Sequence, residues 1–288
     1  MKLIDWLRTN LLLLTVSIPF LLLISIFLAW PTITVLWNSV FLDGSFSLSQ
    51  LSRAMTGTYQ RSFILSIQLG VLTSLLGGTL GMVLAASATS LSRPKWLRPF
   101  LDAWSAVASQ LGGIPLAFAF VSLLGTQGIL TAVLKYLGID LIEMGFSLSS
   151  FSGWVVVYLY FQIPLMFLVV SPAIENMRPE WKEAATMLGA GGSNYWKNIG
   201  IPILLPTIVA GYLLLFVNSF AAYATAYALS SGAGQLVPLQ IRFILQGNVI
   251  TGEDNLGFSL VTWTIFILLI SLIIINRLQR RFSKWTQQ

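Results

Sequence analysis

The stretch EAATMLGAGGSNYWKNIGIP, residues 183–202, is a polar and glycine-rich interruption in the second half of a very apolar chain. Residues 144–174 before it, and residues 198–241, which begin within it, contain no Asp, Glu, Lys or Arg. Because a charged side chain at the centre of a bilayer is costly, long charge-free runs are typical of segments that cross a membrane. The stretch therefore predicts a short helical docking surface outside the membrane, between two spans.

The composition of the chain is that of a membrane protein: 56% of its 288 residues are hydrophobic and only 9% are charged. About a quarter of the residues in a soluble domain are charged, so this chain has too few to cover a surface that faces water. It also contains no Cys and no His. Their absence excludes disulfides, thiol nucleophiles, histidine acid–base chemistry and Cys/His metal sites, and we expect no metal-binding residues.

The charge-free runs predict an all-α integral membrane protein with six transmembrane helices. Each of the six long runs exceeds the roughly 20 apolar residues that a helix needs to cross a bilayer. The fifth run, 198–241, is the longest, but its later part is rich in turn residues, so we expect one span followed by an outer loop. The chain is then a single transmembrane domain, 1–288, with spans at about 11–30, 62–87, 103–124, 152–174, 203–228 and 256–276.

The basic residues predict which ends of the spans face the cytoplasm. Twelve of the 16 Lys and Arg residues fall on one face of the six-span arrangement: Lys2, Arg8, Arg93, Lys95, Arg98, Arg178, Lys182, Lys197, Arg277, Arg280, Arg281 and Lys284. The positive-inside rule places this face in the cytoplasm, together with both termini and loop 175–202. The net charge of +6 follows from this topology, and no nucleic-acid partner is expected.

Proline and glycine predict where the spans end or break. We expect the first span to end at Trp30–Pro31 and to remain uncleaved, since its apolar run is too long for a signal peptide. The sequence Gly112-Gly113-Ile114-Pro115 is expected to kink or break the third span. A short amphipathic outer helix is expected at 129–140. A short surface helix is expected after Pro179, followed by a second short helix through Tyr195–Lys197.

Uncharged polar residues within the spans have two interpretations, hydrogen bonds between helices or the lining of a translocation path. Tyr158 and Gln162 are four residues apart and therefore share a helix face. No ionisable side chain lies deep in any predicted span, whereas carriers driven by protons or sodium usually have intramembrane acids. The candidate path residues are Gln110, Tyr158, Gln162, Asn218 and Tyr223.

The polar interruption has a regular spacing: Glu183-Ala184-Ala185, three residues, Gly189, nine residues, then Ile199-Gly200-Ile201-Pro202. This spacing resembles the signature loop of binding-protein-dependent ABC-transporter permeases, with Ile201 where the family pattern has Leu. The resemblance covers about 60–275 and includes Leu-Leu-Gly-Thr-Gln-Gly at 123–128.

The resemblance implies a transport function shared among several subunits. Such permeases pair with a copy or a homologue, receive substrate from an extracytoplasmic binding protein, and dock on cytoplasmic ATP-binding subunits. The implied coupling residues are Glu183, Ala184, Ala185, Gly189, Ile199 and Pro202, with Glu183 offering charge and capping the helix and Gly189 permitting the turn. The chain has no G-x-x-x-x-G-K-[ST] phosphate loop, so we expect no cofactor and no enzymatic activity here, and ATP in a partner subunit.

Other function classes explain less of the sequence. A membrane-embedded enzyme would need a reactive cluster, and no paired carboxylates lie in or beside a predicted span. A passive channel or an ion-coupled carrier would leave the interruption unexplained. Within the importer class, the resemblance implies permeases for polyamines, ferric iron, thiamine or phosphonates, with polyamines preferred. The expected location is the plasma (inner) membrane of a bacterium or archaeon.

Overall fold

A computed structural model describes residues 17–42, 44–89, 94, 96–230, 234–246 and 254–283, the last five of them by their backbone alone. Both chain termini lie outside the described residues. So do the start of the expected first span and five of the cations used to orient the chain, Lys2, Arg8, Arg93, Lys95 and Lys284. The orientation of the termini therefore remains a prediction.

The regular secondary structure of the described residues is helical apart from one short antiparallel hairpin, β1 (Phe41–Leu42) with β2 (Ser45–Phe46). Six helices are long and apolar enough to cross a membrane, which confirms an all-α membrane protein with six candidate spans. They are Ser17–Val40, Gly57–Ala88, Gly113–Tyr136, Phe151–Glu175, Gly192–Ala221 and Asp254–Leu278.

The chain divides into two compact units. Unit 1 comprises Met1–Gln60 and Ile241–Phe266. Its described elements are η1 (Ser25–Ala29), α2 (Trp30–Val40), the hairpin, α3 (Ser49–Arg53) and the first part of α14 (Asp254–Ser283). The indole Nε1 of Trp263 in α14 donates a hydrogen bond of 3.0 Å to the carbonyl oxygen of Leu51, which ties α3 to α14.

The first helix does not end at Trp30–Pro31, and this correction has a local physical cause. The helix continues to Val40 because η1 is a π turn in which the N–H of Trp30 reaches back to the carbonyl of Ser25. A proline has no N–H and its ring clashes with the carbonyl four residues earlier. The wider turn directly before Pro31 accommodates both effects, as π bulges do elsewhere in α-helices.

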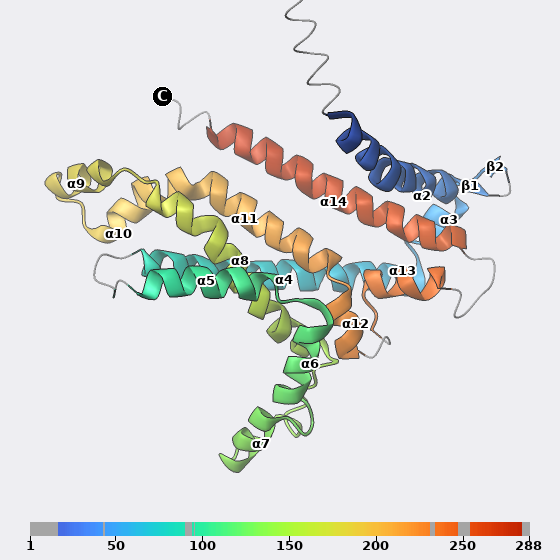
Figure 1. The fold of residues 1–288 in the computed structure, drawn as a ribbon, viewed down its shortest axis with the longest axis horizontal. Helices are drawn as coiled ribbons and strands as arrows, with labels where there is room; N and C mark the ends of the chain where they lie inside the picture. Colours follow the sequence, from blue (N-terminus) through green and yellow to red (C-terminus); the bar gives the residue numbers. More distant parts are fainter. Residues whose placement is uncertain are drawn as a thin grey trace, which may run out of the picture. The chain divides into compact units, whose positions relative to one another are not determined.

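Unit 2, Arg61–Gln240 and Ile267–Gln288, contains the bundle that carries the candidate site. The helices α4 (Gly57–Ala88), α5 (Leu97–Gln110), α8 (Phe151–Glu175) and α11 (Ile201–Ala221) run side by side (Figure 1). One buried core between α4, α8 and α11 includes Ala85, Met166, Phe167, Leu204 and Leu215. This core packs the bundle next to the end where the polar interruption begins.

The glycines of α4 bring three helices into close contact. A methyl group added at Gly77 would lie 2.6 Å from Cβ of Gln162 in α8. One added at Gly78 would overlap the ring of Tyr212 in α11. Small residues let helix backbones approach closely in lipid, where there is little hydrophobic force between helices. The small residues of the second span therefore serve packing within this chain.

Two helices of unit 2 are interrupted. The third predicted span is broken at Leu111–Gly112, as its glycines predict, and α6 (Gly113–Leu124) begins with Gly113 at φ +73°. The next helix, α7 (Ile129–Tyr136), lies within the range of the expected outer helix, but the third candidate span, Gly113–Tyr136, includes it and begins after the break, not at 103. The fifth span, expected to be continuous over 203–228, is interrupted after Ala221 and resumes as α12 (Ala224–Ser230).

The expected outer loop after the fifth span contains a helix instead. This helix, α13 (Val237–Leu245), has Pro238 at its second position, where a missing N–H leaves no helical carbonyl without a partner. The backbone N–H of Val237 donates a hydrogen bond of 2.9 Å to the hydroxyl of Ser66 in α4. Turn residues thus mark the end of α12 but do not prevent a helix from starting directly after them.

We expect Gly81→Ala to destabilise unit 2, because the added methyl group would overlap the carbonyl oxygen of Ile163 and lie 2.7 Å from Cβ of Met166. Neither group is a flexible side-chain tip, so the expected loss is about 1–3 kcal/mol, as for other overpacked cores. Thermal unfolding of the purified protein in detergent measures it.

The matched control is Gly112→Ala, since nothing lies within 4 Å of a methyl group added there. Its φ of −121° suits any residue. Equal melting temperatures for the two variants would contradict the close contact between α4 and α8.

Candidate functional site

A short helix, α9 (Pro179–Met187), follows α8 and begins the polar interruption. Its first turn contains Pro179, whose constrained φ suits that position, and Glu180, whose charge suits the positive end of the helix dipole. No side chain caps its start. The interpretation of Glu183 as a capping residue is therefore wrong, because a capping carboxylate sits at the residue before the helix or at its third residue, and Glu183 is the fifth.

Gly189 ends α9 in the way its position predicts. The N–H of Gly189 donates to the carbonyl of Thr186 at 3.0 Å, and the N–H of Ala190 donates to that of Ala185 at 2.9 Å. These two bonds form a Schellman motif, which needs a left-handed residue after the helix. Gly189 has φ +77°, and nothing lies within 4 Å of where its side chain would be. A glycine is therefore favoured here by conformation, while the surrounding space stays open.

The side chains of α9 divide into an inner and an outer face. Ala185 is buried, whereas Glu183 and Ala184 are exposed. Met187 and Leu188, which we call the apolar tip, are each 88% exposed. Sequence reasoning missed this pair, although two large apolar side chains in an otherwise polar stretch were the signal for it. An exposed apolar pair beside an exposed carboxylate is a feature of surfaces that bind another protein.

The second half of the motif belongs to one long helix. Gly192–Tyr195 (α10), Trp196–Gly200 (η2) and α11 are continuous, so the expected separate helix through Tyr195–Lys197 is wrong. Here too a π turn directly precedes a proline: the N–H of Ile201 reaches back to the carbonyl of Trp196, and Pro202 follows. Ile199 is half-buried and Pro202 is exposed.

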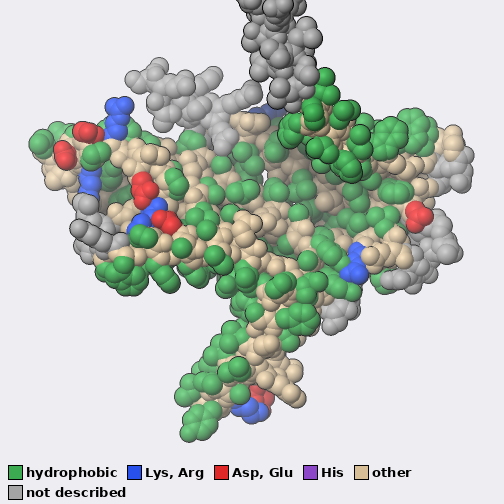
Figure 2. All heavy atoms as spheres, viewed as in Figure 1, with side chains coloured by type: hydrophobic (Ala, Val, Ile, Leu, Met, Phe, Trp, Pro, Cys, Tyr) green, Lys and Arg blue, Asp and Glu red, His purple; other side chains and the backbone are tan. Residues whose placement is uncertain are grey.

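Charged side chains gather near this segment. Figure 2 shows acidic and basic side chains over the end of unit 2 that carries α9, and a smaller group at the tip of α7. Beneath α9 lies an open hollow of about 740 Å³, lined by residues from α4, α8, α9 and η2. Its lining includes Thr89, Glu175, Arg178, Lys182 and Trp196.

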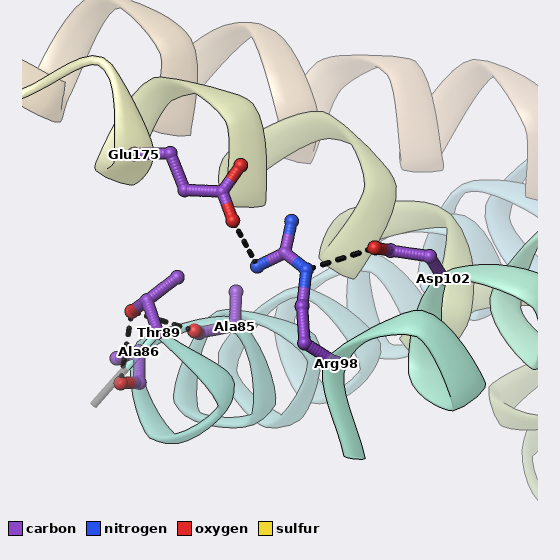
Figure 3. A network of polar contacts seen from close by, with 6 residues as sticks. All are labelled: Ala85, Ala86, Thr89, Arg98, Asp102 and Glu175. Atoms are coloured by element: carbon purple, nitrogen blue, oxygen red, sulfur yellow. Dashed lines mark hydrogen bonds and ion pairs between the residues drawn. The ribbon is translucent and has the colours of Figure 1, made fainter. Parts of the chain in front are cut away.

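Arg98, at the start of α5, joins that helix to the end of α8 (Figure 3). Its Nε donates to both carboxylate oxygens of Asp102, at 2.9 and 3.1 Å. Its Nη1 lies 2.8 Å from Oε1 of Glu175, the last residue of α8. That contact is an ion pair without an aligned hydrogen bond. The guanidinium also lies 5.4 Å from the centre of the Phe167 ring, within cation–π range.

Two of the candidate path residues are fully buried and join helices of the bundle. The hydroxyl of Tyr158 donates a hydrogen bond of 3.1 Å to the carbonyl of Ala222, at the break between α11 and α12. The amide nitrogen of Gln162 donates to the carbonyl of Leu215 at 2.9 Å and to the hydroxyl of Thr73 at 3.4 Å. Both contacts fit hydrogen bonds between helices, and a place in a path remains a prediction.

The other three candidates have partly or fully exposed side chains. Gln110, the last residue of α5, is exposed, whereas Asn218 and Tyr223 are half-buried. The ring of Tyr223 stacks on that of Tyr227, with centroids 5.6 Å apart. The structure therefore does not bring the five residues together as one lining, and these three also remain predicted path residues.

The two helix breaks lie next to each other. The N–H of Gly113, at the start of α6, donates a hydrogen bond of 2.8 Å to the hydroxyl of Thr225 in α12. Cβ of Ala224 would lie 3.5 Å from a methyl group added at Gly113. Irregular backbone at membrane depth has to be satisfied by protein or water. Here Thr225 supplies a partner to the break between α5 and α6, and Tyr158 of α8 supplies one to the break between α11 and α12.

Comparison with known protein families decides the classification. A family model for the binding-protein-dependent transport system inner membrane component matches residues 77–288. The chain belongs to this family. It is therefore a multi-pass component of a bacterial inner membrane, and in such transporters the ATPase lies in separate subunits.

Individual permeases of the family are distant relatives. The putative ferric transport system permease protein FbpB 1 of Haemophilus influenzae is 24% identical over 262 residues, which are 88% of this chain and 40% of that protein. The chain thus spans less than half the length of that relative. The molybdenum transport system permease protein ModB of Mycobacterium tuberculosis is 30% identical over 195 residues, 65% of this chain and 69% of that one.

The fold of this inner membrane component is also found in a solved transporter. A chain in the crystal structure of a bacterial ABC transporter involved in the import of the acidic polysaccharide alginate matches with a TM-score of 0.77. The match covers 98% of this chain and 99% of that chain, at 17% identity. At this identity the likeness shows the fold alone.

We expect Tyr158→Phe to lower the stability of this inner membrane component, because the variant keeps the ring but leaves the carbonyl of Ala222 without its donor. A hydrogen bond of this kind contributes about 0.5–1.5 kcal/mol. Thermal unfolding in detergent is the measurement, with Tyr136→Phe as the control, since Tyr136 is 91% exposed. A Tyr158→Phe protein as stable as the wild type would show that this bond contributes little.

Proposed function

We propose that the chain is the membrane-spanning permease subunit of an ATP-driven importer, and that α9 docks on a cytoplasmic ATP-binding subunit. The observation that carries the docking role is the outer face of α9. Glu183 and the apolar tip project from a helix that Gly189 ends in an exposed turn, immediately after one bundle helix and before another. Family membership supports the importer class.

The outer face of α9 suits a groove on a partner protein. Met187 and Leu188 offer apolar surface that is not buried in the chain itself. Burial of apolar surface contributes about 25 cal/mol per Å², and Glu183 beside it offers a charge that selects a basic partner. Ala185 on the inner face and the two bonds of the Schellman motif hold the helix in shape. Movement of the partner can therefore shift α9 as a unit.

If α9 docks in the cytoplasm, each of the other predicted partners belongs to a definite face of the membrane. The end of unit 2 with α9 faces the cytoplasm, where ATP is bound by the partner subunit and this chain binds no cofactor. A substrate-binding protein meets the opposite face, and lipid surrounds the exposed apolar side chains of the spans. A second permease, either a copy or a homologue, completes the membrane part.

The proposed substrate is a small polar solute that the binding protein delivers. A polyamine remains the candidate that the sequence favours. The names of the related permeases also suggest ferric iron, thiamine, molybdenum or sulfate. Uptake of each radiolabelled solute by the complete importer distinguishes them, and failure of polyamine uptake alone would discard the first choice.

We expect Glu183→Lys combined with Gly189→Arg to abolish co-purification of the ATP-binding subunit. The first change reverses the charge on the outer face, and the second places a side chain on a residue with φ +77°, a backbone conformation that costs a non-glycine residue about 1–2 kcal/mol. Tagged protein is isolated from solubilised membranes, and its partners are identified by mass. The same gel shows whether a second permease is present.

The matched control is Glu143→Lys, which reverses the charge of an exposed side chain outside α9 and the polar interruption. It should retain the ATP-binding subunit at the wild-type level. If the double variant also retains the subunit while both proteins insert normally, α9 is only a surface helix.

Reporter domains fused after Ser92 and after Gln288 should both report the cytoplasm. Both positions lie on the face that carries twelve of the 16 basic residues. A fusion after Gly138, beyond α7, should report the opposite side and serves as the control. An external signal from either of the first two fusions would overturn the proposed orientation.

A further inference from the structure

Arg98 has the most interactions of any charged side chain in the described part of unit 2. Its side chain is 22% exposed, although it carries a full charge. It contacts one residue of its own helix, Asp102, and two residues of α8, Glu175 and Phe167. Phe167 is fully buried in the bundle core. The cation is therefore held against that core by groups from two helices.

Because of the position of Glu175, these contacts join α5 to the end of α8 next to α9. Glu175 is the last residue of α8, and α9 begins four residues later at Pro179. Asp102 lies one helical turn after Arg98 and, by binding Nε, leaves Nη1 directed to α8. The start of α5 is thereby attached to the end of α8, four residues before α9 begins (Figure 3).

The far end of α5 leads to the paired breaks. Three residues after Gln110 ends α5, Gly113 begins α6, and its N–H is bonded to Thr225 of α12. The bundle thus contains a continuous connection from the end of α8, through Arg98 and the length of α5, to the place where both interrupted helices meet. A rigid helix between two bonded ends can transmit a displacement.

We propose that Arg98 is a positioning residue for ATP-driven transport: it makes the start of α5 move together with the end of α8 when α9 is displaced. Displacement of α9 then reaches the breaks between α5 and α6 and between α11 and α12. This inference rests on the proposed docking of α9. It assigns to Arg98 a role that the motif of residues 183–202 does not contain.

The chemistry of the contact explains why an arginine suits the position. A planar guanidinium binds two carboxylates through separate nitrogens and lies over an aromatic face, whereas a lysine ammonium is a compact point charge. Asp102 and Glu175 have side chains that are 46% and 49% exposed. Exposed ion pairs are individually weak, so the combination of both carboxylates with the Phe167 ring defines the geometry.

The test compares Arg98→Glu, Glu175→Arg and the two changes together in the complete reconstituted importer. Three quantities are measured: the ATP-binding subunit retained, ATP hydrolysis stimulated by the loaded binding protein, and solute transported per ATP hydrolysed. We expect each single change to lower transport per ATP about tenfold, which is within the range for coupled contacts, with subunit retention unchanged. The double variant restores a cation on α8 facing two carboxylates on α5 and should recover most of the loss.

Two further variants separate positioning from folding. Arg98→Lys keeps the charge, so its protein should accumulate normally while its transport per ATP lies between those of the wild type and Arg98→Glu. Lys135→Glu breaks the ion pair between Lys135 and Asp140, 2.9 Å apart, which joins only α7 to its own following turn. It should leave transport per ATP unchanged.

The outcomes distinguish this inference from the proposed function. If Glu183→Lys with Gly189→Arg retains the ATP-binding subunit, the docking of α9 fails, and the inference fails with it. If docking holds but all Arg98 variants transport as the wild type does, the positioning role alone is overturned. It is also overturned if the double variant regains the wild-type melting temperature without regaining transport per ATP.

Discussion

Backbone hydrogen bonds constrain this chain most strongly, because a bilayer offers none to a group that lacks a partner. Four irregularities in or next to the described candidate spans are accordingly accommodated by the protein itself. Two prolines, Pro31 and Pro202, stand directly after π turns that keep the helix continuous. The breaks at Leu111–Gly112 and at Ala222–Tyr223 are bonded through Thr225 and Tyr158. The two helix breaks lie next to each other in unit 2, whereas the two π turns lie elsewhere in the chain.

Close packing and a few polar contacts hold those points in place. The glycines of α4 allow α8 and α11 to approach, and Gln162, Thr73 and Ser219 then join the three helices. Each such hydrogen bond contributes modestly within a membrane, about 0.6 kcal/mol on average. Close contact between the helices therefore contributes at least as much as their polarity. It also explains why the small residues of α4 face the interior of the bundle.

The charged end of unit 2 combines two different kinds of surface. The outer face of α9 is exposed and apolar at its tip, which suits a partner protein. Four residues before α9 begins, Glu175 joins Arg98 and Asp102 in a partly shielded network that links α5 to α8. In the proposed importer, α9 first binds the partner and the Arg98 network then carries its displacement to α5. Both are needed, because a docked helix can move the bundle only if the adjoining helices move with it. The hollow of about 740 Å³ beneath α9 leaves room for such movement.

The sequence by itself determined the number of candidate spans, the helix α9 and its end at Gly189. Each follows from a local property: charge-free length, the φ of proline, or the need for a left-handed residue. Local patterns did not give the continuity of the helix past Pro31, because a proline in the sequence looks the same whether the turn before it ends the helix or widens to a π turn. Nor did they give the partners of Tyr158, Gln162 and Arg98. The sequence contains several residues of the right chemistry to form hydrogen bonds or ion pairs with each of these three. Only the packing of α4, α5, α8, α11 and α12 brings one set of partners within bonding distance.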